Sequence, residues 1–257
     1  MITYSHSRIS AFEQCPLKFK FKYIEKIEPD FHQSIEGFLG NKVHETLEWI
    51  YINSMQGILK QLDEVLEYYI ALWQKDVSEE IKIIKLNMTY EDYFNKGIKF
   101  LVDYFTTHFP FKDYTIATEK QIFIPLDTQG EYQLQGYIDR LVFNPQTKIL
   151  EIHDYKTGAL KSQEELDKDR QLAIYSCGIQ SEIQEEIKEI YLVWHYLAFN
   201  KKIVSHRTPD ELNALKEETL KKIKQIESTK EFKSKKSMLC NWCEFKSNCP
   251  TFNPNQS

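Results

Sequence analysis

The sequence lacks any apolar run as long as the roughly 20 residues that a membrane-spanning helix needs. Its first residues, MITYSHSRISAFEQC, have neither the basic start nor the apolar stretch of a signal peptide. Neither an internal repeat nor a low-complexity linker divides the 257 residues. These absences predict a cytoplasmic protein with no membrane association, folded as a single domain over residues 1–257.

The chain also has no G-x-x-x-x-G-K-[ST] phosphate-binding loop, so no helicase motif is present. It contains only five cysteines, and in an intracellular protein these favour metal, cluster or core roles over a disulfide framework. Hydrophobic residues make up 42% and charged residues 28%, which is typical of a globular domain.

Apolar residues at three- and four-residue spacing predict helices over 41–53, within 57–108, over 163–180 and over 209–229. Segments rich in β-forming residues predict strands over 115–125, 131–143, 148–155 and 187–199. A short helix is expected after Ser7, with a break at Pro16. The pattern indicates an α/β (α+β) fold: a mainly helical region over 1–110, a core over 111–229 with a small mixed sheet flanked by helices, and a cysteine-bearing segment over 230–257.

Two acidic residues and a lysine flank a predicted hairpin. With Gln146 and Thr147 at its tip, Asp139 lies opposite Asp154, and directly opposed residues of an antiparallel pair point to the same face. Lys156 follows two residues later, so strand alternation sends it to that face as well. A one-residue slip or a bulge would break the arrangement. The simpler alternative is an Asp–Lys ion pair on an exposed strand edge.

Two carboxylates held close together repel unless a cation lies between them, and oxygen ligands suit Mg²⁺ or Mn²⁺. Such an ion polarises a phosphodiester and lowers the pKa of a bound water toward neutrality. A neighbouring lysine can orient that water or neutralise charge in the transition state. The pattern therefore favours metal-dependent hydrolysis of phosphodiester bonds.

This stretch resembles the PD-(D/E)xK nuclease superfamily, and more closely its RecB-like and CRISPR-associated exonucleases. The family pattern is G-x-[IV]-D, a short hairpin and [DE]-x-K-[TS]-G, which stands here as Gly136-Tyr137-Ile138-Asp139 and Asp154-Tyr155-Lys156-Thr157-Gly158. The resemblance implies a restriction-endonuclease-like core. It also implies that Asp139 and Asp154 are metal ligands, that Lys156 assists the attacking water, and that the backbone carbonyl of Tyr155 completes the metal shell.

Two further segments resemble motifs of the same family. The stretch from Gly40 to Glu48 is similar to its G-x-x-x-H-x-x-L-[ED] helix, which implies that His44 binds the metal. Residues 170–175 are similar to its Q-L-x-x-Y helix, which implies that Gln171 and Tyr175 belong to the catalytic site. The two are four residues apart and so share a helix face, available to phosphate or to the lysine. Glu119 is a candidate accessory acid, but a surface position on a strand is the simpler interpretation and it stays outside the predicted site.

Three cysteines lie close together near the end of the chain, as Cys240-x₂-Cys243-x₅-Cys249. A tetrahedral Zn²⁺ or a four-cysteine iron–sulfur cluster would need a fourth ligand, for which Cys15 and Cys177 are the candidates. The simplest interpretation of Cys177 is a small core residue. RecB-like nucleases with an iron–sulfur domain place one cysteine upstream of the core, so the resemblance implies a [4Fe–4S] cluster on Cys15, Cys240, Cys243 and Cys249. Structural Zn²⁺ is the alternative.

The net charge of −5 is unusual for a protein that holds a polyanion, but residues 17–26 and 230–249 each carry a local charge of +3. These segments predict nucleic-acid contacts at Lys18, Lys20, Lys22, Lys235 and Lys236. A solvated helix face is the alternative for such charge runs. The interleaved aromatics, among them Phe19 and Trp242, suit either base stacking or core packing.

Taken together, the sequence predicts a Mg²⁺- or Mn²⁺-dependent deoxyribonuclease, an exonuclease acting on single-stranded DNA or DNA ends. The resemblance implies a place in DNA repair and recombination or in CRISPR spacer acquisition, with a helicase or CRISPR-adaptation proteins as partners. The alternative is a non-catalytic DNA-binding or assembly subunit built on the same scaffold.

Overall fold

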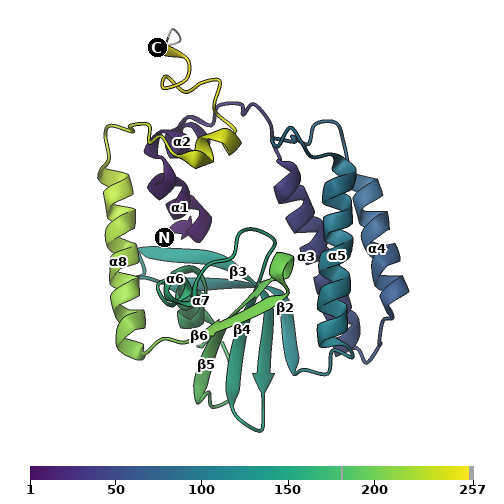
Figure 1. The fold of residues 1–257 in the computed structure, drawn as a ribbon. Helices are drawn as coiled ribbons and strands as arrows, with labels where there is room; N and C mark the ends of the chain where they lie inside the picture. The colour runs from purple at the N-terminus through teal and green to yellow at the C-terminus, as the bar shows by residue number, and fades with distance from the viewer. Residues whose placement is uncertain (181, 255–257) are drawn as a thin grey trace.

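The computed structural model describes residues 1–180 and 182–254. Within them, one six-stranded mixed sheet forms the centre of the molecule, in the order β1-β3-β4-β5-β6, with β2 paired to β3 (Figure 1). The strands are β1 (Ile2–Ser5), β2 (Thr115–Pro125), β3 (Tyr132–Asn144), β4 (Ile149–Lys156), β5 (Glu189–Tyr196) and β6 (Lys201–Ser205). The mixed α/β fold expected from the sequence is confirmed.

Helices pack on both faces of this sheet (Figure 1). The N-terminal group is α1 (His6–Gln14), α2 (Pro16–Phe19) and η1 (Lys20–Glu25), and the second group is α3 (Ile35–Met55), α4 (Leu62–Asp76) and α5 (Tyr90–His108). The remaining helices are α6 (Gln163–Asp167), α7 (Gln171–Ile179), η2 (Leu197–Phe199), α8 (Pro209–Ser228) and η3 (Met238–Trp242). None of the described helices combines the length and apolar character needed to cross a membrane.

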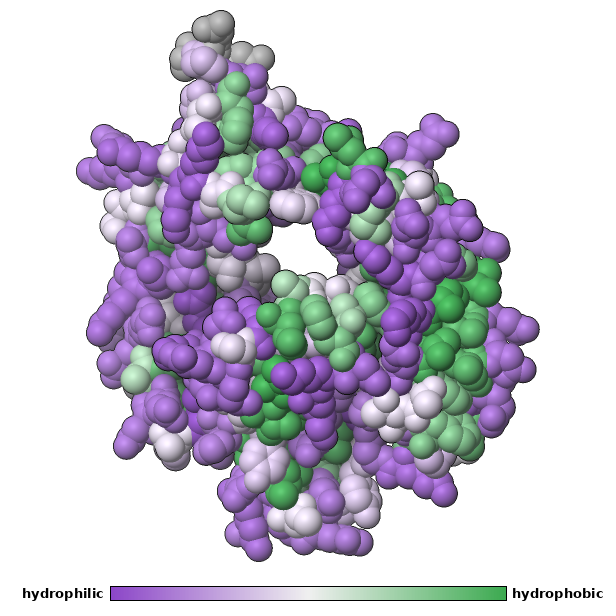
Figure 2. Space-filling view, in the orientation of Figure 1, coloured by the Kyte–Doolittle hydropathy of each residue, from purple (hydrophilic) through white to green (hydrophobic). Residues whose placement is uncertain are grey.

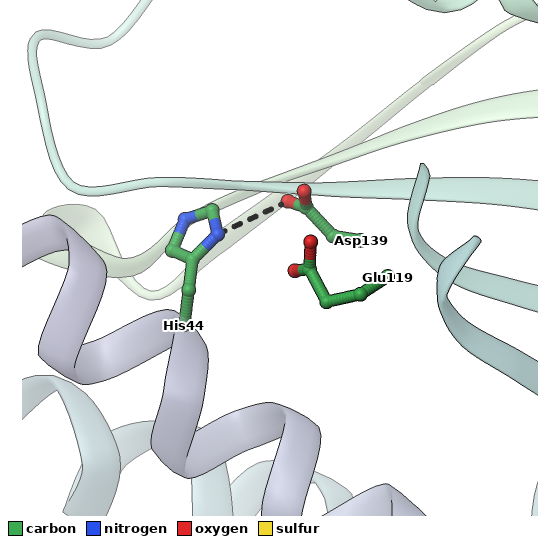
Figure 3. Close-up of side chains that lie close together, drawn as sticks. All are labelled: His44, Glu119 and Asp139. Atoms are coloured by element: carbon green, nitrogen blue, oxygen red, sulfur yellow. Dashed lines mark ion pairs between the residues drawn. The ribbon is translucent and has the colours of Figure 1, made fainter. Parts of the chain in front are cut away.

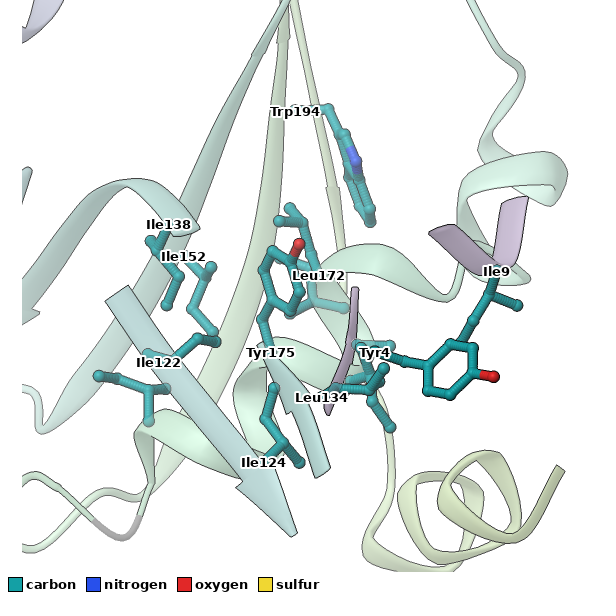
Figure 4. Packing of buried hydrophobic residues seen from close by; sticks show 14 of the residues in the cluster. Tyr4, Ile9, Ile122, Ile124, Leu134, Ile138, Ile152, Leu172, Tyr175 and Trp194 are labelled. Carbon is teal, nitrogen blue, oxygen red and sulfur yellow. The ribbon is translucent and has the colours of Figure 1, made fainter. Parts of the chain in front are cut away.

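Two hydrophobic cores hold these layers together. The larger one lies between the sheet and helices α1, α7 and α8, and contains Ile122, Ile138, Leu172 and Trp194 (Figure 4). The second lies among α3, α4 and α5 and reaches the sheet through Tyr155. Because Tyr155 and its neighbour Asp154 point to opposite faces of β4, this stretch of β4 is anchored between the two cores.

The molecule has an opening between its upper and lower parts. The space-filling view shows it as a gap through the protein, with α1 on one side and α3 on the other, above the sheet (Figures 1 and 2). The C-terminal segment closes the upper rim by packing on the N-terminal helices. There the backbone N–H of Asp30 donates to the carbonyl of Glu244 at 2.7 Å, and Lys18 pairs with the Glu244 carboxylate at 2.7 Å.

Several predicted boundaries were wrong for local reasons. The first helix begins at His6, because Ser5 and not Ser7 caps it. Helix α3 begins at Ile35 and runs through both glycines, because the Ser34 hydroxyl accepts from the N–H of Gly37 at 3.2 Å.

Two predicted helices are interrupted. The stretch 57–108 is divided into α4 and α5, and each of the two begins with a capping box, at Gln61 and at Thr89. The stretch 163–180 is divided into α6 and α7, where the Asp169 carboxylate accepts from the N–H of Gln171 at 2.9 Å. The strand predicted to reach 199 ends at Tyr196 and continues as η2.

Candidate metal and catalytic site

The hairpin between β3 and β4 has the predicted register. Asn144 pairs with Ile149 and Arg140 pairs with His153, so the extension of this ladder brings Asp139 opposite Asp154. The ladder stops one residue short of that pair, however. Asp139 instead reaches along β4, and its carboxylate accepts from the backbone N–H of Tyr155 at 2.8 Å.

Asp139 also faces Glu119 across the β2–β3 ladder. The residues on either side pair regularly, Thr118 with Arg140 and Lys120 with Ile138, but Glu119 has a φ of 44°. A left-handed conformation is costly for a residue with a side chain and is often found at functional sites. Here it coincides with the point at which the two carboxylates lie next to each other.

His44 completes a group of three. It comes from α3, and its Nδ1 lies 3.5 Å from the Asp139 carboxylate while its Nε2 lies 2.8 Å from the carbonyl of Tyr155 (Figure 3). One ligand atom from each of His44, Glu119 and Asp139 lies within 4.8 Å of the others, and among the described residues this is the only such group of three or more. The three side chains line one pocket together with Asn41, Glu45 and Glu48.

In the metal-free protein, keeping both Glu119 and Asp139 ionised costs free energy. Burial, and then repulsion from Asp139, raises the pKa of Glu119 to about 7. Burial, and then repulsion from Asp154, raises the pKa of Asp139 to about 6. A divalent cation would relieve both costs, and two carboxylate oxygens with one imidazole nitrogen are a suitable ligand set for Mn²⁺ or Mg²⁺.

Asp154 lies beside this group and forms an ion pair with Lys156. It is 3% exposed, and the Lys156 ammonium lies 2.9 Å from its Oδ1 and 2.7 Å from its Oδ2. The Gln171 amide donates to Oδ1 at 3.2 Å, whereas the buried Oδ2 accepts no further hydrogen bond beside its ion pair with Lys156. Asp154 therefore keeps an electron pair available to a cation, but it is not one of the three residues whose ligand atoms cluster.

Lys156 is held in its charged form. Burial alone would lower its pKa, but the charge of Asp154 and the hydrogen bond to it outweigh burial and raise the pKa. An ammonium that stays protonated at neutral pH cannot abstract a proton. Its available roles are to orient a water or to neutralise a developing negative charge.

Tyr155, which lies between Asp154 and Lys156, is held in place by hydrogen bonds to its side-chain hydroxyl. The Tyr155 hydroxyl accepts from Nε of Arg140 at 2.9 Å and lies 3.3 Å from the hydroxyl of Tyr104. Arg140 is 1% exposed and also bonds to Asp113 and to His153. Both backbone groups of Tyr155 that face the site, its N–H and its carbonyl, are thus held in place by a buried network.

Two glycines of the motifs allow close packing around the site. A Cβ on Gly136 would lie 2.4 Å from the ring of Tyr175, so only glycine lets α7 approach β3 here. A Cβ on Gly40 would lie 3.3 Å from the hydroxyl of Thr157. Tyr175 is 5% exposed and its ring lies in the larger core (Figure 4), while burial, and then the charge of Asp154, raises the pKa of its hydroxyl to about 12. Gln171 on the same helix reaches Asp154 and also accepts from Lys156 at 3.2 Å.

The structure therefore gathers the predicted residues His44, Asp139, Asp154, Lys156 and Gln171, and adds Glu119, which the sequence prediction left out. The strand pattern gives an acidic residue on β2 no special weight. A count across the β2–β3 ladder would have placed it opposite Asp139.

The four cysteines of the second predicted site line one pocket. Cys15 lies between α1 and α2, and the other three, Cys240, Cys243 and Cys249, come from the C-terminal segment. The backbone N–H of Lys235 donates to Sγ of Cys15 at 3.4 Å, and that of Ser237 donates to Sγ of Cys240 at 3.3 Å. No three of these Sγ atoms form a group within 4.8 Å, and all four residues lie in the described part of the chain. Cys177 instead packs against the larger core, as its simplest interpretation predicts.

Most of the lysines predicted to bind nucleic acid have acidic or backbone partners. Lys18 and Lys22 both pair with Glu244, and Lys20 pairs with Glu25. Lys235 donates to the carbonyl of Glu13 at 3.0 Å, and Lys236 lies over the ring of Phe252. Among the interleaved aromatics, Phe19 is 1% exposed and stacks on Phe232, so for this ring core packing is the correct interpretation.

Comparison with known proteins identifies a family over almost the whole chain. The sequence profile of the PD-(D/E)XK nuclease superfamily matches residues 3–250. No curated protein matches. Among solved structures, the chain is similar to SSO0001, with 13% identity, a TM-score of 0.45 and coverage of 97% of this chain and 86% of that one. It is also similar to a candidate exonuclease from Eubacterium rectale, with 13% identity, a TM-score of 0.48 and coverage of 91% and 85%.

Proposed function

Since the chain belongs to the PD-(D/E)XK nuclease superfamily, we propose that it is a Mn²⁺- or Mg²⁺-dependent deoxyribonuclease with its active site at Asp139, Asp154 and Lys156. The observation that carries this proposal is the group of His44, Glu119 and Asp139 beside the buried Asp154–Lys156 pair. A binding protein has no use for clustered carboxylates that repel DNA, whereas a metal-dependent hydrolase needs them.

His44, Glu119 and Asp139 would hold the metal, together with Asp154 and the carbonyl of Tyr155. The bound ion would supply a Lewis acid for the phosphodiester and a water of lowered pKa. Lys156 is protonated and pairs with Asp154, so it orients the attacking water and neutralises charge that develops on the phosphate. Gln171 bridges Asp154 and Lys156 and fixes their relative position.

The preferred substrate is single-stranded DNA with a free end. The opening between α1 and α3 supports this choice, because a strand threaded through a gap must enter by an end (Figure 2). Burial, then the charge of Arg170 and more weakly that of Lys156, lowers the pKa of His6 on α1 to about 4, so α1 borders the site. Exonuclease cutting follows from entry by an end.

The four-cysteine pocket is proposed to hold a [4Fe–4S] cluster. The resemblance of the cysteine spacing to that of iron–sulfur nucleases favours the cluster, and tetrahedral Zn²⁺ on the same four thiolates is the alternative. N–H groups that donate to Sγ are also typical of iron–sulfur sites. Brown anaerobic protein with absorption near about 400 nm would support the cluster, and colourless protein that contains zinc would contradict it.

The second candidate function is a non-catalytic DNA-binding subunit of a repair or CRISPR complex. A Mn²⁺ assay on wild type and on Lys156→Ala separates the two. The proposed nuclease cleaves linear single strands, loses at least about 100-fold in rate without the Lys156 ammonium, and leaves circular single strands intact. Equal activity in both proteins would refute the catalytic assignment.

Lys99→Ala is the matched control for this assay. Lys99 also pairs with an aspartate, Asp103, but it lies on the exposed surface of α5. The control should cleave at the wild-type rate. Binding assays would test whether a helicase or a CRISPR-adaptation protein is a partner of this chain. The partner that binds would distinguish a role in repair from one in spacer acquisition.

A further inference from the structure

One face of the sheet carries an uncharged surface that the proposed chemistry does not use. On β2 and β3, Ile122, Ile124, Leu134 and Ile138 point into the larger core. The residues that alternate with them therefore project to the opposite side, where the surface continues onto β1. We name this surface the strand platform; it consists of Thr3, Ser5, Gln121, Phe123, Gln133, Gln135 and Tyr137.

The composition of the strand platform is unusual for this protein. None of its seven side chains is charged, although 28% of the chain is charged and about two of seven would be expected to be so. Two of the seven are large aromatics with much of their surface exposed, Phe123 at 46% and Tyr137 at 50%. In the described part of the chain, no other aromatic ring stacks on either of them.

The two rings lie close enough to act together. Gln121 pairs with Tyr137 and Phe123 pairs with Gln135, so the rings occupy diagonal positions on neighbouring strands. Side chains in such positions lie about 7–8 Å apart, within reach of aromatic groups. The Gln135 amide donates to the Tyr137 hydroxyl at 3.4 Å, at the edge of the ring, and half of the Tyr137 side chain stays exposed.

The strand platform is continuous with the metal-binding group. Tyr137 is two residues from Asp139 on β3, and Gln121 is two residues from Glu119 on β2. Two residues of strand span about 6.6 Å, so a strand with one phosphate at the carboxylates has its neighbouring nucleotides over the platform.

We propose that the strand platform binds the bases of single-stranded DNA next to the phosphate that is cleaved. Phe123 and Tyr137 stack on bases, and the amides of Gln121 and Gln135 hydrogen-bond to base edges. The chemistry favours bases over other occupants. A surface that follows the phosphate backbone needs cations, which are missing here, whereas aromatic rings bind any base through its π-face.

This inference rests on the proposed nuclease function, and the two can be tested separately. Binding is measured in Ca²⁺ with a labelled 12-residue oligothymidylate and with an abasic strand of the same length. We expect wild type to bind the thymidine strand at least about 10-fold more tightly than the abasic strand. Tyr137→Ala and Phe123→Ala should lose most of that preference and bind the abasic strand like wild type, and Tyr137→Phe should keep it.

Phe199→Ala is the matched control, because Phe199 is an equally exposed aromatic, at 53%, outside the strand platform. It should behave as wild type. In cleavage assays Tyr137→Ala should raise KM about 10-fold and leave kcat unchanged, since stacking contributes equally before and during the reaction. Equal loss of affinity for both strands, or none for either, would overturn the platform while leaving the nuclease intact. Wild type that neither binds nor cleaves DNA would overturn the proposed function itself.

Discussion

Glu119 and Asp139 carry carboxylates that are costly to ionise without a cation. Their pKa values are about 7 and about 6, raised by burial and by neighbouring acids. Both values lie above those of the unfolded chain, so between about pH 4 and pH 7 the folded protein binds more protons than the unfolded one. Stability of the metal-free protein therefore falls as the pH rises through this range.

Glu119→Gln should stabilise the metal-free protein while it abolishes metal-dependent activity. The amide removes a charge that is expensive to keep, so we expect the free energy of unfolding to rise by about 1–2 kcal/mol at pH 8, after allowing for the partial exposure of Glu119. At pH 4, where Glu119 is protonated, the gain should vanish. Urea unfolding at both pH values tests this. A gain of the same size at pH 4, or at pH 8 for the exposed control Glu164→Gln, would contradict it.

Metal binding should weaken sharply in acid. Protons compete with Mn²⁺ for Glu119 and Asp139, so the Mn²⁺ concentration at half-maximal activity should rise at least about 10-fold between pH 8 and pH 6. The measurement is a Mn²⁺ titration of cleavage rate at several pH values. A constant half-maximal concentration would show that neither carboxylate binds the metal.

At this scale the motif residues were predictable, whereas Glu119 could be named only as a candidate accessory acid. Asp139, Asp154 and Lys156 stand in a pattern whose spacing already carries chemical meaning. The role of Glu119 depends on a left-handed backbone at one position of β2, and no residue pattern in 115–125 encodes that conformation.

The contact between α7 and β3 fixes the site at the scale of secondary structure. Gly136→Ala would place a methyl group against the Tyr175 ring, and overpacking of this kind costs about 1–3 kcal/mol. Gly158→Ala is the matched control, because its Cβ would meet nothing within 4 Å. We expect thermal unfolding to give a lower Tm for Gly136→Ala and an unchanged Tm for Gly158→Ala. Equal stability of the two variants would mean that α7 is free to move away from β3.

The hairpin register could be predicted because its short turn leaves one arrangement that keeps the apolar residues of both strands on the core side. The pairing Arg140–His153 follows from it directly. Strands β1 and β6 were missed for a different reason. Each has four or five residues at the edge of the sheet, too few for alternation to show in the sequence, and their pairing depends on distant partners.

Two segments far apart in the chain, one within residues 14–21 and one within 234–252, line the cysteine pocket together. Cys15 is separated from Cys243 by the entire catalytic core, and a shared cluster would close the rim of the opening. Cys15→Ser and Cys243→Ser should each lose iron and lower Tm by about 5 °C or more, because metal binding stabilises the folded state. Cys177→Ser should keep its iron. Iron content and Tm of all three test this, and full iron in Cys15→Ser would remove Cys15 from the cluster.

The most direct test of the metal-dependent site is Mn²⁺ binding and cleavage by wild type and Asp139→Asn at pH 8, on the same linear single strand. Asp139 touches His44, Glu119 and the backbone of Tyr155, so its charge is central to the group. The account predicts that calorimetry gives Mn²⁺ affinity at least about 10-fold weaker in the variant, and that cleavage falls at least about 1,000-fold. Wild-type Mn²⁺ affinity and cleavage in Asp139→Asn would contradict it.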